Sequence, residues 1–154
     1  MEKKELKQIT TKVYEDYGFV KKGKYYYLDL EDVLICSGFS HMYNSITYLA
    51  YNFSVKAVHS EEEREPNNMF DGYDSWEVQM YFNRRAEGYH KREISLDWDK
   101  EYYANKLKEL LSYYFDPFKK DALNHIRRCY KEIGFLHENE IIIVSAKAKE
   151  FLGL

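Results

Sequence analysis

The sequence predicts an α+β domain with an N-terminal helix, an antiparallel sheet of about five strands, and two to three C-terminal helices packed on one sheet face. Three observations lead to this class. Apolar residues recur at helical spacing over residues 3–17, strand-like stretches follow at short intervals, and helical spacing returns after residue 99. Short links favour antiparallel neighbours, because parallel strands need long crossovers. Nothing marks a domain boundary, so we expect a single globular domain over 1–154.

The first helix carries its apolar residues at spacings of three and four. Gly18 follows it, where a helix end needs a residue free to adopt positive φ. Residues 33–36 are apolar on both faces, as in a central strand, and a break is expected at 40–45. The strand-like stretches are 24–30, 33–36, 46–58, 76–82 and 94–98.

The second half of the chain predicts helices. Asp97 or Asp99 can cap a helix that Pro117 interrupts, and a third helix then ends at Gly134. Residues 140–152 fit a strand in their first half and a helix in their second half, and we favour the helix there. The apolar stripe of the second helix is Tyr103, Leu107, Leu110, Leu111 and Tyr114.

Alternation along the strands divides the sheet into two faces. The set expected to face the helices is Leu49, Tyr51, Phe53, Val55, Trp76, Val78, Met80, Phe82, Ile94, Leu96 and Trp98. The opposite face gathers tyrosines together with amides and carboxylates, which is the composition of a recognition surface. The alternatives are a solvated face or one covered by the C-terminal segment. The tyrosines predicted to bind a partner are Tyr25, Tyr27, Tyr48 and Tyr81.

Acidic residues crowd the segment between 61 and 77, where Arg64 is the only cation. Such a run is typical of a solvated loop, and it also suits attraction of a basic partner, for example a nuclease toxin. Its carboxylates lack the spacing of a calcium loop, so no metal is predicted. The acidic residues assigned to partner binding are Glu61, Glu62, Glu63, Glu65, Asp71 and Asp74.

Composition and motifs argue against several classes. A net charge of −3 and scattered basic residues speak against nucleic acid, and no apolar run is long enough to span a bilayer. The N-terminus has no secretion signal and two distant cysteines form no framework, so we expect a cytoplasmic protein. We predict no cofactor and no catalytic residue. Cys36 lies near His41 but inside an apolar strand, where a thiol is inert.

The segment from Tyr17 to Tyr26, which reads YGFVKKGKYY, resembles the start of a bacterial family called domain of unknown function 4304. The apolar strand at 33–36 and the stretch at 51–55 are similar too. The resemblance covers about the first third of the chain. Gly38-Phe39-Ser40-His41 departs from the segment that family members often carry after the second strand. The resemblance implies the same fold and no assigned activity.

We therefore expect a small bacterial protein-interaction module, with an immunity-like role as one concrete form. It would use the tyrosine-lined sheet face to hold a partner and the acidic loop to attract it. The alternative is a small-molecule-binding protein or an enzyme with a cleft between sheet and helices, which a deep apolar pocket would support. Self-association through the tyrosine face is a third possibility.

Overall fold

The computed structural model describes residues 1–42, 46–60, 73–83, 85, 87, 91–132 and 140–154. These residues form the predicted α+β fold. Its elements are α1 (Lys3–Tyr17), β1 (Val20–Lys22), β2 (Tyr25–Asp29), β3 (Val33–Met42), β4 (Ile46–Val55), the 3-10 helix η1 (Lys56–Val58), β5 (Val78–Gln79), α2 (Lys100–Cys129) and α3 (Ala146–Leu152).

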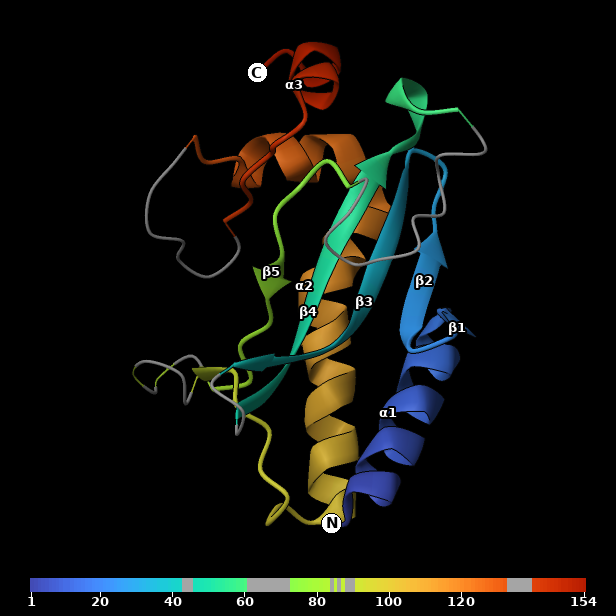
Figure 1. Ribbon diagram of the computed structural model, residues 1–154, viewed down its shortest axis with the longest axis vertical. Helices are drawn as coiled ribbons and strands as arrows, with labels where there is room; N and C mark the ends of the chain where they lie inside the picture. Colours follow the sequence, from blue (N-terminus) through green and yellow to red (C-terminus); the bar gives the residue numbers. More distant parts are fainter. Residues whose placement is uncertain (43–45, 61–72, 84, 86, 88–90, 133–139) are drawn as a thin grey trace.

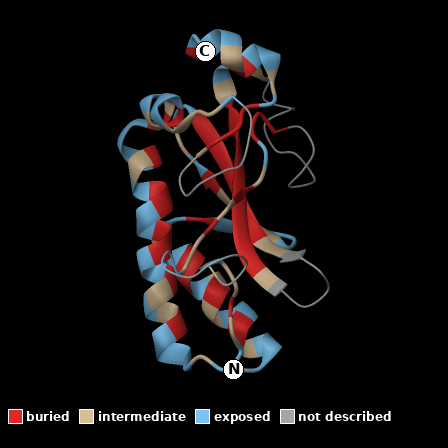
Figure 2. Ribbon diagram, turned by 90° about the vertical axis from the view of Figure 1, so that its left-hand side faces the viewer, coloured by how far each residue is buried: buried red, intermediate tan, exposed pale blue. Residues whose placement is uncertain are grey.

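The five strands form one antiparallel sheet in the order β1-β2-β3-β4-β5. Helices α1 and α2 lie side by side behind the sheet in Figure 1, so they cover one of its faces. Figure 2 shows the same arrangement from the side, with buried residues along β3 and β4 and along the parts of the helices that face them. Helix α3 is short and lies at one end of the sheet, in contact with η1.

Strands β3 and β4 form the longest ladder, from the pair Val33↔Val55 to the pair Met42↔Ile46. Alternate residues of both strands point toward the helices and enter the core. The members predicted for β4 are confirmed, since they are all buried. These residues are Leu49, Tyr51, Phe53 and Val55.

Aromatic rings join the sheet to the helices. The Tyr51 ring packs edge-on against Phe115 and Phe118 of α2, with centroids 5.1 and 5.7 Å apart. On the α1 side, the hydroxyl of buried Tyr14 lies 2.8 Å from Ser37 Oγ. Ser37 donates its single proton to the carbonyl oxygen of Ala50 at 2.8 Å, so Tyr14 is the donor to Ser37. These bonds satisfy polar groups that would otherwise destabilise the core.

The edge beyond β4 differs from the prediction. β5 has two residues instead of the expected strand over 76–82, and the residues at 94–98 form no strand. Ile94 still donates its N–H to the carbonyl of Thr47. The assignments of Trp76 and Leu96 to the core are wrong, because these side chains are 54% and 37% exposed. Val78, Met80 and Ile94 are buried as predicted. Met80 and Ile94 donate to carbonyls of β4, whereas Trp76 donates to Ile142 of the tail, so alternation holds where the chain lies against β4.

Three further boundaries differ from the prediction. β3 continues to Met42, into the break expected at 40–45, and β4 ends at Val55, where η1 replaces the predicted strand end. In α2, the chain remains helical through Pro117 and breaks four residues later at Asp121, where φ is −163° and ψ is 89°. The last part of α2 therefore turns across the end of the sheet (Figure 1). A proline removes one backbone bond and kinks a helix without having to end it.

The C-terminal segment makes isolated bridges in its first half and a helix in its second half. Ser75 bridges Ile143 in antiparallel fashion and Tyr130 bridges Ile141 in parallel fashion, but both are isolated bridges outside the named strands, so residues 141–144 form no strand. Helix α3 then begins after Ser145, whose side chain accepts from the Ala148 N–H. The expected helix is confirmed in the second half. The helix before it ends at Cys129, short of the predicted end at Gly134, because Tyr130 is extended; Gly134 itself lies outside the described residues.

Asp121 caps the second part of α2, since its Oδ1 accepts from the Asn124 N–H at 3.2 Å. We predict that Asp121→Ala lowers the free energy of unfolding by about 1 kcal/mol, because that N–H loses its partner. Chemical denaturation measures the change. Asp121→Asn retains a capping oxygen and should change stability little, as should Ser112→Ala on the exposed side of the first part. Equal losses for Asp121→Ala and Asp121→Asn would contradict the capping role.

Candidate functional site

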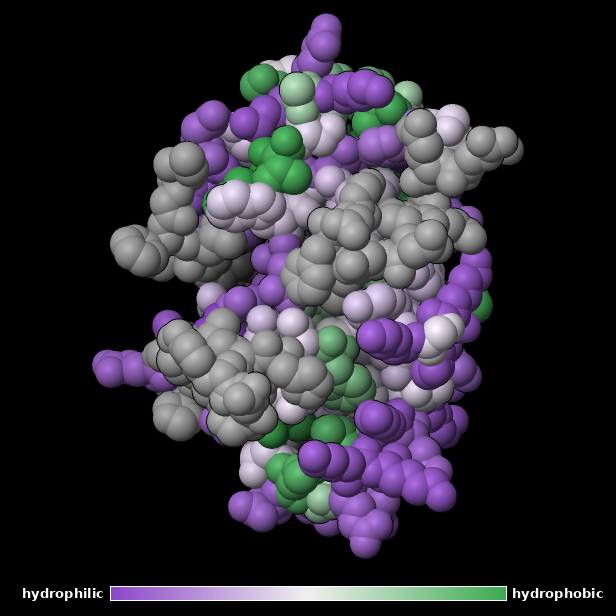
Figure 3. Space-filling model, in the orientation of Figure 1, coloured by the Kyte–Doolittle hydropathy of each residue, from purple (hydrophilic) through white to green (hydrophobic). Residues whose placement is uncertain are grey.

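The sheet face away from the helices carries a second, smaller hydrophobic cluster, which we call the tyrosine cluster. Tyr48 and Tyr73 are 3% and 7% exposed, so the expected exposed position of Tyr48 is wrong. Figure 3 views this face, and hydrophobic side chains reach the surface near its two ends. The tyrosine cluster consists of Cys36, Tyr48, Ala50 and Tyr73, with Tyr25 and Tyr27 packed against it.

Small residues allow the tyrosines to lie close to the sheet. A Cβ added to Gly38 would meet Cδ1 of Tyr25 at 2.8 Å, so the ring of Tyr25 fills the space above this glycine. Tyr25 and Tyr27 are half-buried as a result, and Lys22 lies over Tyr27 with its Nζ 5.9 Å from the ring centroid. This face is thus largely a packed layer with a limited accessible margin.

Polar groups border the tyrosine cluster. The Tyr48 hydroxyl donates to Glu77 Oε2 at 3.4 Å, and the guanidinium carbon of Arg92 lies 5.4 Å from the Tyr48 ring centroid. Burial raises the pKa of Glu77. Tyr81 is half-buried outside the cluster, where its N–H donates to the hydroxyl of Tyr114 at 2.9 Å. The four tyrosines expected to form one contact surface are therefore not equivalent.

Asp74 is buried, which corrects its assignment to a solvated acidic loop. Its Oδ2 accepts from the Val55 N–H at 2.6 Å, and both carboxylate oxygens lie within 3.0 Å of His59 Nε2. The carboxylate holds the end of β4 and the start of the next segment together, so its role is structural. The other acidic residues predicted to bind a partner lie outside the described residues, namely Glu61, Glu62, Glu63, Glu65 and Asp71.

The two cysteines and the possible metal ligands among the described residues show no catalytic arrangement. Burial raises the pKa of Cys36 to about 11, so this thiol stays protonated at neutral pH. Cys129 Sγ lies 3.7 Å from His125 Nδ1, but burial raises the pKa of the thiol and lowers that of the imidazole to about 4. Neither partner is then charged. Across the described part of the chain, no group of three or more residues is placed to bind a metal.

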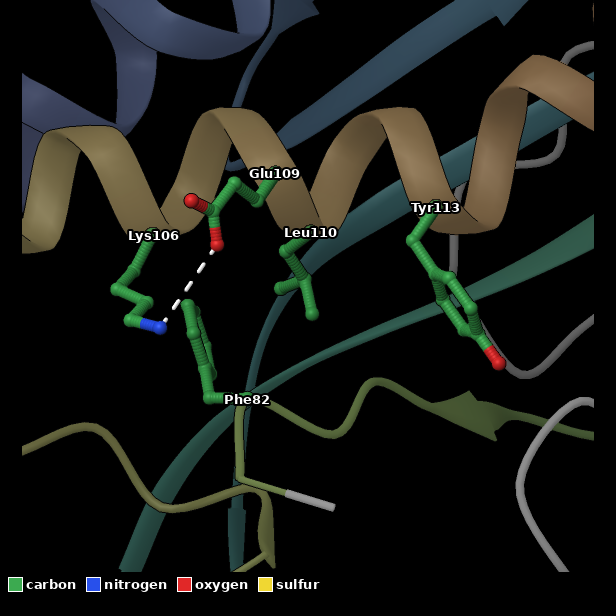
Figure 4. A pocket seen from close by; sticks show the side chains of 5 residues that line it. All are labelled: Phe82, Lys106, Glu109, Leu110 and Tyr113. Carbon is green, nitrogen blue, oxygen red and sulfur yellow. Dashed lines mark ion pairs between the residues drawn. The ribbon is translucent and has the colours of Figure 1, made fainter.

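Two pockets lie on the helices. One, of about 300 Å³, lies between α1 and α2 and is lined by residues such as Ile9, Val13 and Ala104. The other, of about 230 Å³, lies where α2 meets the chain after β5. Figure 4 shows Phe82 facing α2 from that chain, beside Leu110 and the ion pair of Lys106 with Glu109. Both are at or below the lower end of the usual ligand-pocket size of about 300–1,000 Å³.

The second pocket belongs to a longer exposed line on α2, which we call the α2 stripe and define as Tyr102, Lys106, Glu109 and Tyr113. Spacings of four, three and four place these residues on one side of the helix. Tyr102 and Tyr113 are 48% and 38% exposed, and Lys106 Nζ lies 5.7 Å from the Tyr102 ring centroid. Trp98 adds a half-buried ring against Tyr102, with centroids 5.5 Å apart.

The buried stripe predicted for this helix is confirmed. The exposed α2 stripe was not predicted. The signal was the doublets Tyr102-Tyr103 and Tyr113-Tyr114. Neighbouring residues on a helix point about 100° apart. Tyr103 and Tyr114 belong to the buried stripe, and the preceding residue of each doublet lies outside it and is exposed.

Comparisons of the chain with protein-family models, curated proteins and solved structures gave no match. The resemblance of the first third to domain of unknown function 4304 therefore stays a prediction. No helix in the described part of the chain is long and apolar enough to cross a membrane.

We predict that Asp74→Ala lowers the free energy of unfolding by about 3 kcal/mol, because a buried N–H and an imidazole lose their shared acceptor. Denaturant titration at neutral pH measures this loss. Asp29→Ala is the control, since Asp29 is exposed and pairs with Lys56 at the surface. It should change stability by less than about 1 kcal/mol. A loss for Asp74→Ala no larger than for Asp29→Ala would contradict the structural role.

His125 should make stability depend on pH. Its folded pKa of about 4 lies below the ordinary value of 6.5, because burial and then the nearby Arg128 disfavour the charged form. Between these values the unfolded chain binds more protons, so stability falls as pH drops from 6.5 toward 4. We expect His125→Gln to lose less stability than the natural protein between pH 7 and 5. Parallel losses in denaturation at the two pH values would refute this.

Proposed function

We propose that this protein is a protein-interaction module whose contact surface is centred on the α2 stripe. The observation that carries the proposal is the pair of exposed tyrosines on one side of α2, of which Tyr113 lines a small pocket. Tyrosine and tryptophan dominate the energetics of protein interfaces, because their rings bury large areas and keep a polar handle. Here Tyr102, Tyr113 and Trp98 contribute to one surface.

Solvent exposure supports the α2 stripe over the tyrosine cluster as the contact surface. Tyr48 and Tyr73 are packed in the tyrosine cluster, whereas Tyr102 and Tyr113 reach solvent. The half-buried Tyr25 and Tyr27 provide at most a margin of the contact area. Attraction of a basic partner by Glu61, Glu62 and Glu63 remains part of the proposal, as does an immunity-like role.

The small-molecule alternative has less support from the described residues. The space between sheet and helices is filled by buried rings, among them Tyr51, Phe115 and Phe118. The two pockets described lie at the helix surface and are small or shallow. An exposed aromatic surface with a small pocket suits a side chain of a protein partner better than a whole ligand.

We predict that Tyr102→Ser combined with Tyr113→Ser abolishes capture of the binding partner in a quantitative pull-down from lysate of the native cells. Each truncation removes a large ring from the contact surface, and a central ring at an interface contributes about 2 kcal/mol or more. Purified partner and protein then give the dissociation constant directly. Circular dichroism checks that the variant remains folded.

Phe151→Ser is the matched control, since Phe151 is an aromatic residue of α3 that is 46% exposed. It should bind as the natural protein does. Loss of binding with Phe151→Ser and not with the double tyrosine variant would move the contact surface away from α2. If the natural protein captures no partner and does not self-associate, the proposed function is wrong.

A further inference from the structure

We propose that the α2 stripe binds a second copy of this chain, forming a two-fold symmetric dimer in which the two α2 helices pack antiparallel. This inference rests on the proposed function and names the partner of the same surface. The reason is that the stripe is self-complementary: its chemistry is symmetric about a single point on the helix.

The point of symmetry lies midway between Leu107 and Lys108. Tyr102 precedes that point by as many residues as Tyr113 follows it, and Lys106 and Glu109 stand in the same relation. In an antiparallel pair with its two-fold axis there, residues equally far from the point on opposite sides face each other across the interface. Tyr102 then faces Tyr113 of the second copy, and Lys106 faces Glu109. Each contact occurs twice.

Charge favours this pairing. Lys106 Nζ and Glu109 Oε2 already lie 3.7 Å apart within one chain, and both side chains are substantially exposed, at 39% and 74%. In the dimer the two cations and two anions form an alternating group of four around the axis. Opposite charges that face each other fix the register of an interface and reject arrangements that bring like charges together.

The pocket supplies a place for the aromatic residue of the second copy. It is lined by Tyr113, Phe82 and Leu110, which lie together in Figure 4. Tyr102 of the second copy faces Tyr113 in the proposed arrangement and so reaches this pocket. A volume of about 230 Å³ is sufficient for a ring, since an engineered protein cavity of about 150 Å³ binds benzene. The ring would replace solvent between Phe82 and Tyr113.

The strength of the dimer follows from its size. The stripe extends over about 16 Å of helix, because each residue adds about 1.5 Å. A seam of that length and about 10 Å wide, the diameter of a helix, covers far less than the roughly 800 Å² per partner of a standard stable interface. We therefore expect a reversible dimer that dissociates in the micromolar to millimolar range.

Sedimentation equilibrium of the full chain over that range tests the proposal. The average mass should rise with concentration from 18.6 kDa toward twice that value. Lys106→Glu places Glu against Glu at both symmetric contacts, and Glu109→Lys places Lys against Lys. Each single variant should weaken self-association by about tenfold or more, because like charges are forced together.

Mixing the two single variants gives the decisive result. A Lys106→Glu chain carries two anions and a Glu109→Lys chain carries two cations, so all contacts of the mixed dimer are attractive. The mixture should associate at least as strongly as the natural protein, and the chain with both substitutions should recover self-association. If the single variants acted only by destabilising α2, association would recover neither in the mixture nor in the chain with both substitutions. Lys147→Glu on α3, an exposed site, is the control for net charge.

Three results would overturn the dimer: a natural protein that stays monomeric at millimolar concentration, single variants that associate normally, or a mixture that fails to associate. If the chain is monomeric, but the natural protein captures a different protein in the pull-down and the double tyrosine variant does not, the dimer is wrong and the proposed function is supported. If the chain is monomeric and captures no other protein, both the dimer and the proposed function are wrong.

Discussion

The long ladder between β3 and β4 is the constraint on which the other contacts depend. Its register places Ile35 beside Phe53 and Ser37 beside Tyr51, so alternate side chains of both strands reach the helices. A shift of one residue would turn Tyr51 away from Phe115 and would take Ser37 from the hydroxyl of Tyr14. Sheet register and helix packing therefore specify each other, through ring contacts on α2 and a hydrogen bond to α1.

The same ladder determines what the opposite face can be. Cys36, Gly38 and Ala50 are small, and tyrosines from β2, β4 and the chain after residue 72 fill the space above them. The sheet thus has a core on one side and a thin aromatic layer on the other. Exposed tyrosines lie instead on α2, at Tyr102 and Tyr113.

Elements with strong local signals could be predicted from the sequence, and those that depend on distant partners could not. Helix α1, its end at Gly18 and the buried stripe of α2 follow from periodicity and from a positive φ. The segment at 76–82 alternates like a strand, yet Trp76 at its start donates its N–H to Ile142 of the C-terminal tail and its side chain is exposed. Nothing local in the sequence shows that Asp74 meets Val55 and His59. The exposed tyrosines of the α2 stripe could have been predicted from the tyrosine doublets, after the buried stripe of α2 had been assigned.

The pairing of Ser75 with Ile143 has a consequence for synthesis. The ribosome releases β1 to β4 and the segment at 73–76 well before residues 141–144, which cover that segment's free side. During this interval the nascent sheet has an open hydrogen-bonding edge, and such edges pair readily with other chains. The helices behind the sheet can form meanwhile, but they leave this edge uncovered. The vulnerable period for misassembly is therefore set by the time needed to translate the roughly 65 residues between the two partners, rather than by the stability of the finished fold.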